Sequence, residues 1–429
     1  MTTPYRLGIA GLGTVGIGVV KMVQTHGTML AAKAGRAIEI TAVSARDRAR
    51  DRGADLSAYA WEEDAAALAA REDVDCVVEV IGGSEGLARD LVERALAGGK
   101  DVVTANKALI AHHGQALAEA AEAADAALRV EAGVAGGIPV MKALGEGLAG
   151  NGISRLFGVL NGTCNYILTE METRGASYPE VLADAQALGY AEADPTFDVG
   201  GIDAAHKLAI LAATAFGTRI DFDGVVCEGI ERVTLDDIAT ARDMGFSIKL
   251  LGLAKLHPEG LEQRVRPCMV RADTVIGALP GVTNACVIEG DFVGQVALTG
   301  PGAGEGATAS AVISDVLDAA RGVRTPLFGR PAAALQSAAR LDHGDEHSPY
   351  YLRFMLADQP GALALLASAL GDSGVSIHRM RQYAQGDAAV PVVIVTHDAR
   401  RDGIDAALST ISALPVSKAD PVAIRIEEV

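Results

Sequence analysis

The first third of the chain alternates short apolar runs with longer amphipathic stretches. The apolar runs are continuous, which is typical of strands buried on both faces of a parallel sheet. The stretches between them are long enough for helices that cross from one strand to the next. The pattern predicts an α/β fold with a doubly wound parallel sheet, whose strands are at 5–10, 38–43, 74–81, 101–104 and 128–131.

The pattern changes at about residue 154. From there, apolar runs are interrupted by Gly and Pro at irregular spacing, which indicates a second, mixed sheet rather than further crossover units. A Gly-rich turn then leads into a long helix of small residues. This part predicts an α+β domain, with strands at 249–256, 262–270, 284–290 and 295–300.

A polar segment, residues 343–349, precedes the last part of the chain. There the apolar pattern indicates strand, helix, two strands and helix, with one more strand after them. We expect a separate βαββαβ unit, with strands at 350–356, 375–384, 390–397 and 422–429.

The first predicted strand runs directly into Gly-Leu-Gly-Thr-Val-Gly, in which Gly11, Gly13 and Gly16 have the G-x-G-x-x-G spacing. These glycines permit a tight turn, close approach of the backbone to a pyrophosphate, and close packing of helix on strand. Thr14 and Val15 lie within this motif, and the helix expected after it, from Ile17, has N–H groups at its N-terminus that attract the anion. The motif predicts a Rossmann-type site for NAD or NADP; the alternative is a plain Gly-rich turn.

The tip of the second strand bears on which dinucleotide is expected. An NAD-specific site usually has Asp or Glu there, to hold the ribose diol. Here Ser44 is followed by Arg46 and Arg48, and guanidinium groups pair well with a 2′-phosphate. The sequence favours NADP, although Asp47 leaves NAD open and the two Arg can instead begin a solvated helix.

Two further strand ends lie at the same edge of the sheet. Gly82 and Gly83 follow the strand at 74–81, and Lys107 follows the strand at 101–104. Ligands of open α/β sheets bind beside the carboxyl ends of the strands. These three residues are therefore expected to border the ligand crevice.

A cluster of acids and one Lys stands at the start of an apolar helix within residues 189–216. Asp203 and Lys207 are four positions apart, so they share one face of that helix. Gly200 and Gly201 let the backbone turn just before it. A surface ion pair is the simpler interpretation, but the convergence of several acids with one Lys favours a site for a polar substrate.

The sequence GYAEADPTFDVGGIDAAHKL (189–208) resembles the signature of homoserine dehydrogenases, and NGTCNYIL (161–168) and ANKALIAHHG (105–114) resemble further segments of that family. The family interconverts L-homoserine and L-aspartate 4-semialdehyde with NAD or NADP, in threonine, methionine and isoleucine biosynthesis. The resemblance implies that Lys207 gives or takes the proton at the substrate oxygen, with Lys107 close by. The expected substrate site comprises Gly189, Tyr190, Glu192, Asp198 and Asp203. The expected cofactor site comprises Gly11, Gly13, Thr14, Val15, Gly16, Arg46, Arg48, Gly82, Gly83, Lys107, Gly189, Glu192 and Gly304.

Two more segments resemble parts of such enzymes. EAGVAGGIPVMKAL (131–144) resembles the segment that binds a monovalent cation such as Na⁺; by spacing alone, a Gly-rich hinge is an equal interpretation. The last part, with its Asp-x-Pro-Gly turn at 358–361, resembles an ACT domain, which implies pairing of chains and amino-acid binding. We expect L-threonine as effector near that turn, and a homodimer or homotetramer. The implied cation ligands are Glu131, Val134, Gly136 and Ile138.

The expected organisation has three domains. Residues 1–132 form the nucleotide-binding domain, to which a helix within 300–325 returns. Residues 133–299 form the catalytic and dimerisation domain, and residues 348–429 form the regulatory ACT domain.

Composition narrows the class of protein. The net charge of −18, without a Lys/Arg-rich run, argues against nucleic acid or anionic membranes as partners. No stretch is long enough to span a bilayer, and the start of the chain lacks the pattern of a signal peptide. The five scattered Cys indicate reduced thiols and a cytoplasmic location.

Two alternatives remain open from the sequence. One is an enzyme like aspartate-semialdehyde dehydrogenase, which needs an activated Cys thiolate; Cys164 is the nearest candidate and has no His beside it in the sequence. The other is a non-catalytic NAD(P)-sensing regulator that uses the ACT domain. The presence of Glu192, Asp203 and Lys207 argues against a regulator without catalysis.

Overall fold

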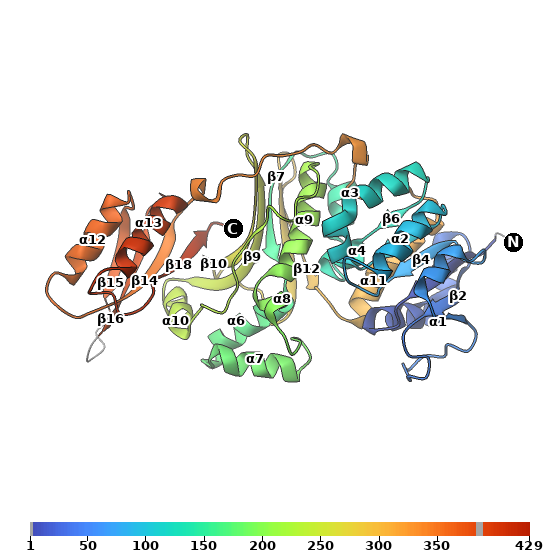
Figure 1. The fold of residues 1–429 in the computed structure, drawn as a ribbon, viewed down its shortest axis with the longest axis horizontal. Coiled ribbons are helices and arrows are strands. Elements are labelled where there is room, and N and C mark those ends of the chain that lie inside the picture. Colours follow the sequence, from blue (N-terminus) through green and yellow to red (C-terminus); the bar gives the residue numbers. More distant parts are fainter. Residues whose placement is uncertain (1–2, 383–388) are drawn as a thin grey trace.

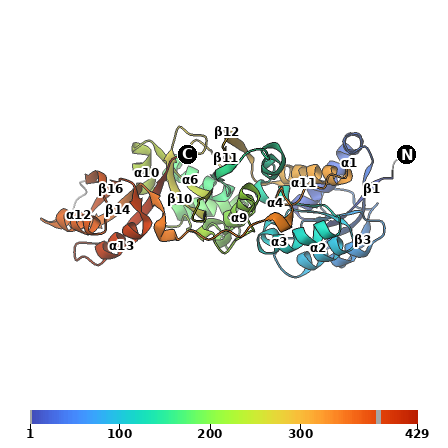
Figure 2. The ribbon, with the colours of Figure 1, turned by 90° about the horizontal axis from the view of Figure 1, so that it is seen from above.

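The computed structural model of the chain describes residues 3–382 and 389–429. The molecule is elongated, with three regions in a row: a nucleotide-binding region at one end, a central region, and a C-terminal region at the other end (Figure 1). The view from above shows the same order (Figure 2). The last residues turn back and lie beside the central region (Figure 1).

The nucleotide-binding region contains a parallel sheet of six strands: the five predicted ones and a short edge strand, β3, that the sequence pattern did not indicate. The strand at 101–104 is confirmed residue for residue, whereas the predicted last strand is too long, because Glu131 already begins a helix. In spatial order the strands are β3 (Ala60–Glu62), β2 (Ile38–Ser44), β1 (Tyr5–Ala10), β4 (Cys76–Glu79), β5 (Asp101–Thr104) and β6 (Leu128–Arg129).

Helices cover both faces of this sheet, because neighbouring strand residues point to opposite sides. Val77 packs in one apolar cluster and Val78 in the other. The helix that returns from residue 305 packs on the first helix, and Gly18 permits this contact: a Cβ there would lie 2.8 Å from the carbonyl oxygen of Glu305. The helices are α2 (Leu87–Ala97) and α3 (Lys107–Ala123) on one face, and α1 (Thr14–Ala34) and α11 (Glu305–Ala320) on the other.

The central region is built on the second sheet, most of whose neighbouring strands are antiparallel. The four strands predicted there are present, and the whole sheet has ten strands. Along it lie β12 (Gly294–Pro301), β11 (Thr283–Gly290), β7 (Ile153–Val159), β9 (Phe246–Leu256), β10 (Leu261–Arg271), β18 (Val422–Glu427), β14 (Tyr350–Leu356), β16 (Val390–Thr396) and β15 (Ile377–Gln382), with β8 (Val226–Cys227) paired to β10.

One helix of the central region is buried from Asp203 to Ala215 without interruption. It lies between the central sheet and the nucleotide-binding region (Figure 1). A helix in that position can present its few polar side chains only to the boundary between the two regions. The helices here are α4 (Glu131–Ala135), α5 (Val140–Lys142), α6 (Gly162–Arg174), α7 (Tyr178–Ala187), α8 (Thr196–Val199), α9 (Ile202–Phe216) and α10 (Leu235–Asp243).

The C-terminal region has the predicted βαββαβ order: β14, α12 (Ala362–Asp372), β15, β16, α13 (Arg401–Ser412) and β18. The strand predicted at 375–384 is β15, and residues 383–384 lie outside the described part of the chain. Two short strands, β13 (His347–Ser348) and β17 (Ala399–Arg400), pair with each other.

This region has an apolar core of its own, but its strands continue the sheet of the central region. Strand β18 pairs antiparallel with β14 and also parallel with β10, where Cys268 is opposite Arg425. The polar segment supplies buried partners rather than a solvated linker: Glu346 is 5% exposed and forms ion pairs with Arg264 and Arg266 of β10. The central and C-terminal strands therefore form one continuous sheet.

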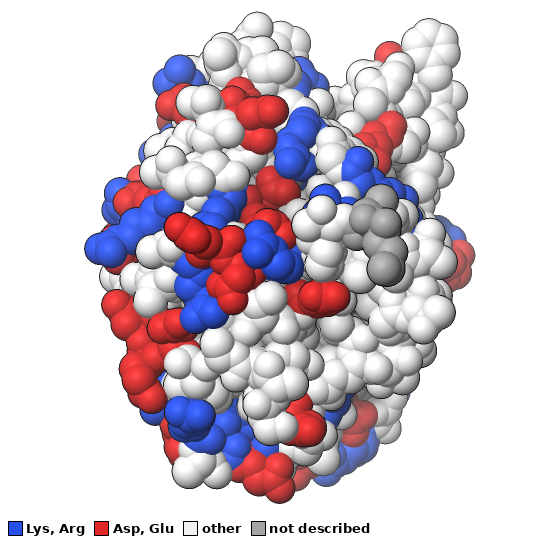
Figure 3. All heavy atoms as spheres, turned by 90° about the vertical axis from the view of Figure 1, so that its right-hand side faces the viewer, with Lys and Arg blue, Asp and Glu red and all other residues white. Residues whose placement is uncertain are grey.

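On the surface at the nucleotide-binding end, acidic and basic side chains are intermixed (Figure 3). Among residues 3–382 and 389–429, no helix is both long enough and apolar enough to cross a membrane.

Candidate active site

Three charged side chains meet where α9 faces the nucleotide-binding region. Lys207 Nζ donates to Asp203 Oδ2 at 2.7 Å and to the carbonyl oxygen of Leu160, also at 2.7 Å. Lys107 Nζ lies 3.2 Å from the other carboxylate oxygen of Asp203. The predicted Asp203–Lys207 pair is thus present, and the first residue of α3 adds a second cation from the other region.

The Asp203 carboxyl group is buried, yet its neighbours favour its charged form. Burial alone would raise the pKa of the Asp203 carboxyl, but Lys207, Lys107 and the hydrogen bonds to it hold the pKa well below its usual value. A Lys ammonium has three N–H donors, and protein acceptors occupy two of those on Lys207. One donor is left for a ligand.

Asn161 organises the acids, and the sequence did not single it out as a site residue. Its Nδ2 donates to Asp198 Oδ1 at 2.8 Å and to Asp203 Oδ2 at 3.0 Å, while its Oδ1 accepts the Cys164 N–H at the start of α6. Burial raises the pKa of Asp198, and the bond from Asn161 opposes that rise. A preference for Asn at helix N-caps is the one local signal that marks this residue.

Asn284 is a second side chain that the sequence did not single out. It lies on β11, 1% exposed, and its Nδ2 donates to the Leu160 carbonyl oxygen at 3.0 Å. The oxygen that holds Lys207 therefore accepts two donors.

A cavity of about 630 Å³ lies over this cluster, and residues of both regions line it. Asn161 and Asn284 are among them. The predicted site residues in its lining are Thr14, Val15, Lys107, Val134, Gly136, Gly189, Tyr190, Asp198, Asp203, Lys207 and Gly304.

The glycine loop has the geometry that its spacing predicted. Gly11 has φ +99°, and a Cβ there would lie 2.7 Å from the carbonyl oxygen of Val80. Gly13 is the N-cap of α1, whose first residues line the cavity, and at Gly16 a Cβ would collide with the Gly11 carbonyl group. The loop thus brings the start of α1 to the cavity, as a dinucleotide site requires.

The loop with Gly82 and Gly83 lies at the next strand end. Both residues have positive φ. The buried Glu79 carboxylate accepts the Gly82 N–H, and Asn106 Nδ2 donates to the Gly83 carbonyl oxygen. These contacts fix the loop beside α3, but neither glycine is part of the cavity lining.

The arginines at the tip of β2 lie on the surface beside the glycine loop. Arg46 and Arg48 are exposed, and the Arg48 guanidinium lies over the Trp61 ring at 5.9 Å. Arg52, which the sequence did not single out, also lies over Trp61 and donates to the Leu12 carbonyl oxygen. Two guanidinium groups, of Arg48 and Arg52, thus lie over Trp61, and that of Arg52 also contacts the turn after β1.

Glu192 lies apart from the cluster. The residue is exposed, is not part of the cavity lining, and has its backbone carbonyl bonded to Gln186. The structure brings Asp198 and Asp203, rather than Glu192, into the cavity with Lys207.

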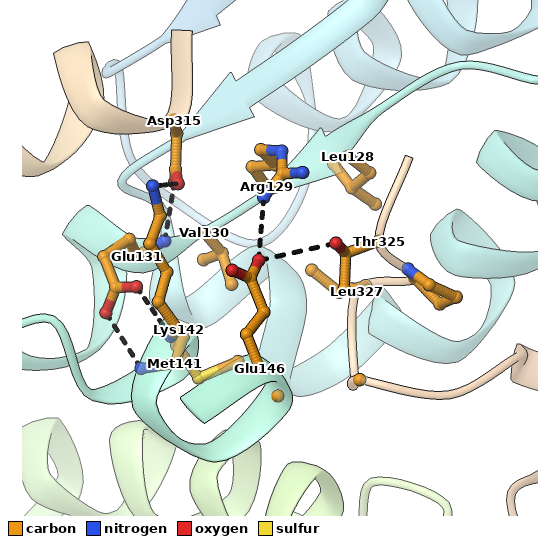
Figure 4. Close-up of a pocket in the computed structure, with 13 residues that line it drawn as sticks. Leu128, Arg129, Val130, Glu131, Met141, Lys142, Glu146, Asp315, Thr325 and Leu327 are labelled. Carbon is orange, nitrogen blue, oxygen red and sulfur yellow. Dashed lines mark hydrogen bonds and ion pairs between the residues drawn. The ribbon is translucent and has the colours of Figure 1, made fainter. Parts of the chain in front are cut away.

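Three of the four implied cation ligands border two different cavities, and the fourth, Ile138, lines neither. The Glu131 carboxylate accepts the N–H groups of Met141 and Lys142 at 2.9 Å each and borders a small cavity of about 40 Å³ (Figure 4). Val134 and Gly136 line the large cavity instead, and the Ile138 carbonyl oxygen accepts an N–H.

The charged groups around Glu131 affect whether a monovalent cation can bind there. Burial, and then the nearby Asp315, raise the pKa of Glu131 to about 7. The Lys142 ammonium lies 3.5 Å from Asp315 and occupies the positive position beside these two acids (Figure 4). Among the described residues there is no group of three or more His, Cys, Asp or Glu arranged to hold a metal ion. The residues therefore fit a monovalent cation only in part.

Cys164 does not have the character of a nucleophile. The residue is fully buried, its Sγ lies 3.3 Å from the Asp198 carbonyl oxygen, and burial raises the pKa of its thiol well above the ordinary value. A thioester-forming mechanism, as in aspartate-semialdehyde dehydrogenase, lacks its thiolate here.

Known proteins are similar to this chain along its whole length. Sequence profiles described as "Homoserine dehydrogenase, NAD binding domain", "Homoserine dehydrogenase" and "ACT domain" match residues 11–131, 139–317 and 350–416. Homoserine dehydrogenase of Pseudomonas aeruginosa is 43% identical over 433 residues, which cover 99% of each chain. That of Corynebacterium glutamicum is 41% identical, over 98% of this chain and 95% of its own.

Solved structures agree with the sequences. A homoserine dehydrogenase from Thiobacillus denitrificans superposes with a TM-score of 0.94 at 39% identity, over 99% of each chain. That of S. aureus superposes with a TM-score of 0.78 at 31% identity, over the whole of each chain. Since these matches extend through the glycine loop, the Lys207 helix and the C-terminal strands alike, the chain belongs to the homoserine dehydrogenase family.

Proposed function

We propose that this oxidoreductase interconverts L-homoserine and L-aspartate 4-semialdehyde with Lys207 as the group that exchanges the proton at the substrate oxygen. One observation carries this assignment. Hydrogen bonds to the Leu160 carbonyl oxygen and to Asp203 fix Lys207 Nζ, which leaves one N–H donor. The Lys207 side chain lines the same cavity as Thr14 and Val15 of the glycine loop. A general acid must be held within hydrogen-bond reach of the atom that it protonates.

The neighbouring groups divide the remaining tasks. When bound, NAD or NADP supplies or accepts the hydride. During reduction Lys207 gives a proton to the aldehyde oxygen, and during oxidation it takes the proton from the hydroxyl group. Lys107 adds a positive charge on the same side, where negative charge develops on that oxygen. Asp198 and Asp203 supply the carboxylates for the substrate ammonium group.

For the cofactor, we favour NADP over NAD. The support is the arginines at the tip of β2, which suit a 2′-phosphate, and the absence of Asp or Glu at Ser44, the last residue of that strand. Gly189, Glu192 and Gly304 stay predicted cofactor contacts, and of these Gly189 and Gly304 line the cavity.

Initial rates of homoserine oxidation with NAD and NADP test the reaction. The matched control is 4-hydroxybutanoate, which is homoserine without its amino group. We expect turnover with homoserine and a much lower kcat/KM with the control, because the carboxylates of the site lose their partner. Equal kcat/KM for the two would contradict ammonium recognition by Asp198 and Asp203.

We further propose that an amino acid, with L-threonine as the first choice, regulates the enzyme by binding near residues 358–361. The support is the buried link from that region to the central one: Tyr351 and Arg353 of β14 both donate to Asp237 of α10. An effector acts only by binding one state better than another, so such a link is required.

We keep a homodimer or homotetramer and a cytoplasmic location as expectations; the five thiols are free.

Threonine titration of the full-length enzyme, beside Asp358→Ala, tests this regulation. We expect inhibition that weakens in the variant. A truncation at 343–349 is unsuitable, because it removes β18 from its place beside β10. Equal inhibition of both proteins would exclude the site at 358–361.

A monovalent cation at Glu131, Val134, Gly136 and Ile138 stays a prediction, since only part of that set is open to it. Replacing Na⁺ by tetramethylammonium at constant ionic strength tests it. Unchanged thermal stability and activity would count against the site.

A further inference from the structure

We propose that Asn284 is a positioning residue for the reaction, which it serves by holding the Leu160 carbonyl group that directs Lys207. The inference rests on the proposed role of Lys207 and extends it to a residue on a different strand.

The amide of Asn284 has only one chemically sensible orientation. The Leu160 carbonyl oxygen can only accept, so the atom facing it at 3.0 Å must be the amide nitrogen. The same oxygen accepts from Lys207 Nζ at 2.7 Å. The two donors together fix the direction of the carbonyl group, and with it the place of Nζ.

The Leu160 carbonyl group needs a side-chain donor because Leu160 lies one residue beyond the backbone pairing of β7 with β11. Strand β7 ends at Val159, which is the last residue that pairs with β11, opposite Ala285. Asn284 precedes Ala285, so its backbone lies opposite Leu160. The side chain of Asn284 thus supplies the hydrogen bond where the ladder stops.

The local packing is built around this amide. A Cβ at Gly302 would lie 2.1 Å from Asn284 Nδ2, and a Cβ at Gly162 would lie 3.2 Å from Oδ1. The buried Oδ1 has no hydrogen-bond partner among the described residues. A buried acceptor without a partner costs about 1–3 kcal/mol, so stability alone does not explain an Asn at this position. The hydrogen bond that its Nδ2 donates to Leu160 explains why Asn stands there.

Asn284→Leu is the decisive variant, because it keeps the branched shape of the side chain and removes an acceptor that is already unpaired. Leu160 keeps Lys207 as its donor, so no new unpaired group arises. We expect a Tm close to that of the wild type and a loss in kcat that exceeds any change in cofactor Kd or substrate KM, because Asn284 also lines the cavity. The kcat should fall about 10- to 100-fold, the usual cost of a misdirected catalytic group.

Asn165→Leu is the matched control. Asn165 is equally buried, but its Oδ1 accepts from the Lys249 ammonium and its Nδ2 donates to the backbone at Leu279 and Gly281. Among the described residues its amide has no hydrogen bond to Leu160 or Lys207. We expect the opposite result: a lower Tm and a normal kcat for the folded enzyme.

Asn284→Asp adds a signature that a structural role does not produce. An ionised carboxylate has no donor for Leu160, whereas a protonated one regains it. The ratio of variant to wild-type kcat should therefore rise as pH falls, and the Leu variant should show no such rise.

Three results would overturn the inference. The first is a kcat of Asn284→Leu within about twofold of that of the wild type. The second is a loss of kcat in Asn284→Leu that is accompanied by a lower Tm, as expected for Asn165→Leu. The third is a ratio of Asn284→Asp kcat to wild-type kcat that does not change with pH. The proposed function fails separately: an active Lys207→Ala enzyme would refute the role of Lys207, whatever Asn284 does.

Discussion

Two buried carboxylates, Asp203 in α9 and Asp237 in α10, are bound in contrasting ways. Asp203 is shared by two ammonium groups and an amide, and it borders the large cavity. Asp237, fully buried, accepts from Tyr351, from Arg353 and from the Thr234 hydroxyl and N–H groups that close the start of its own helix.

The difference lies in the donors that are left over. Around Asp203 the cations carry more N–H donors than the protein uses, and those donors border open space. Around Asp237 the donors come from one Arg, one Tyr and a helix cap, and all are packed between α10 and β14. Buried charge alone therefore does not mark an active site; unused donors beside a cavity do.

The strongest test of this contrast is Lys207→Ala. Removing the proton-exchanging group should lower kcat by about 10²–10⁴-fold, the usual contribution of a positioned general acid. Cofactor binding, measured by fluorescence titration, should stay near wild type, because the glycine loop is untouched. Turnover close to that of the wild type would end the assignment.

The second test is Asp237→Ala, with the neighbouring, exposed Asp236→Ala as control. Breaking a buried ion pair from one side costs about 3–5 kcal/mol, because Arg353 is left without its partner. We expect a clear loss in urea or thermal unfolding for Asp237→Ala alone. If its unfolding midpoint matches that of the control while kcat falls, Asp237 would belong with Asp203 and the contrast would be wrong.

The smallest expected effect concerns Arg46 and Arg48, which are exposed and whose proposed partner is the 2′-phosphate of bound NADP. Arg46→Ala combined with Arg48→Ala should weaken NADP by about tenfold or more, near 1.4 kcal/mol, and NAD much less. Calorimetric Kd values for both cofactors measure this. Equal losses would mean that these arginines support the β2 turn and do not read a 2′-phosphate.

Sequence patterns were most informative where local rules decide the structure. The continuous apolar runs predicted the parallel strands, and helical spacing placed Asp203 and Lys207 on one face. The glycine spacing likewise predicted the tight turn at Gly11.

Contacts between distant segments gave no such signal. Leu160 acts through its carbonyl group, which every residue has, and Asn284 meets it from another strand. Glu346 lies in the polar segment 343–349, and its polarity does not reveal that it pairs with buried Arg side chains of a distant strand. The parallel pairing of β18 with β10 is equally invisible locally.

That pairing has a consequence for how the protein is made. Every other strand of the large sheet emerges from the ribosome before β18 does. Until β18 arrives, β10 presents an unpaired edge at Cys268–Val270, and such edges recruit strands of other chains. Synthesis of β18 is thus the step that closes this sheet, and a variant that weakens its pairing with β10 should reduce the yield of folded enzyme before it affects the chemistry.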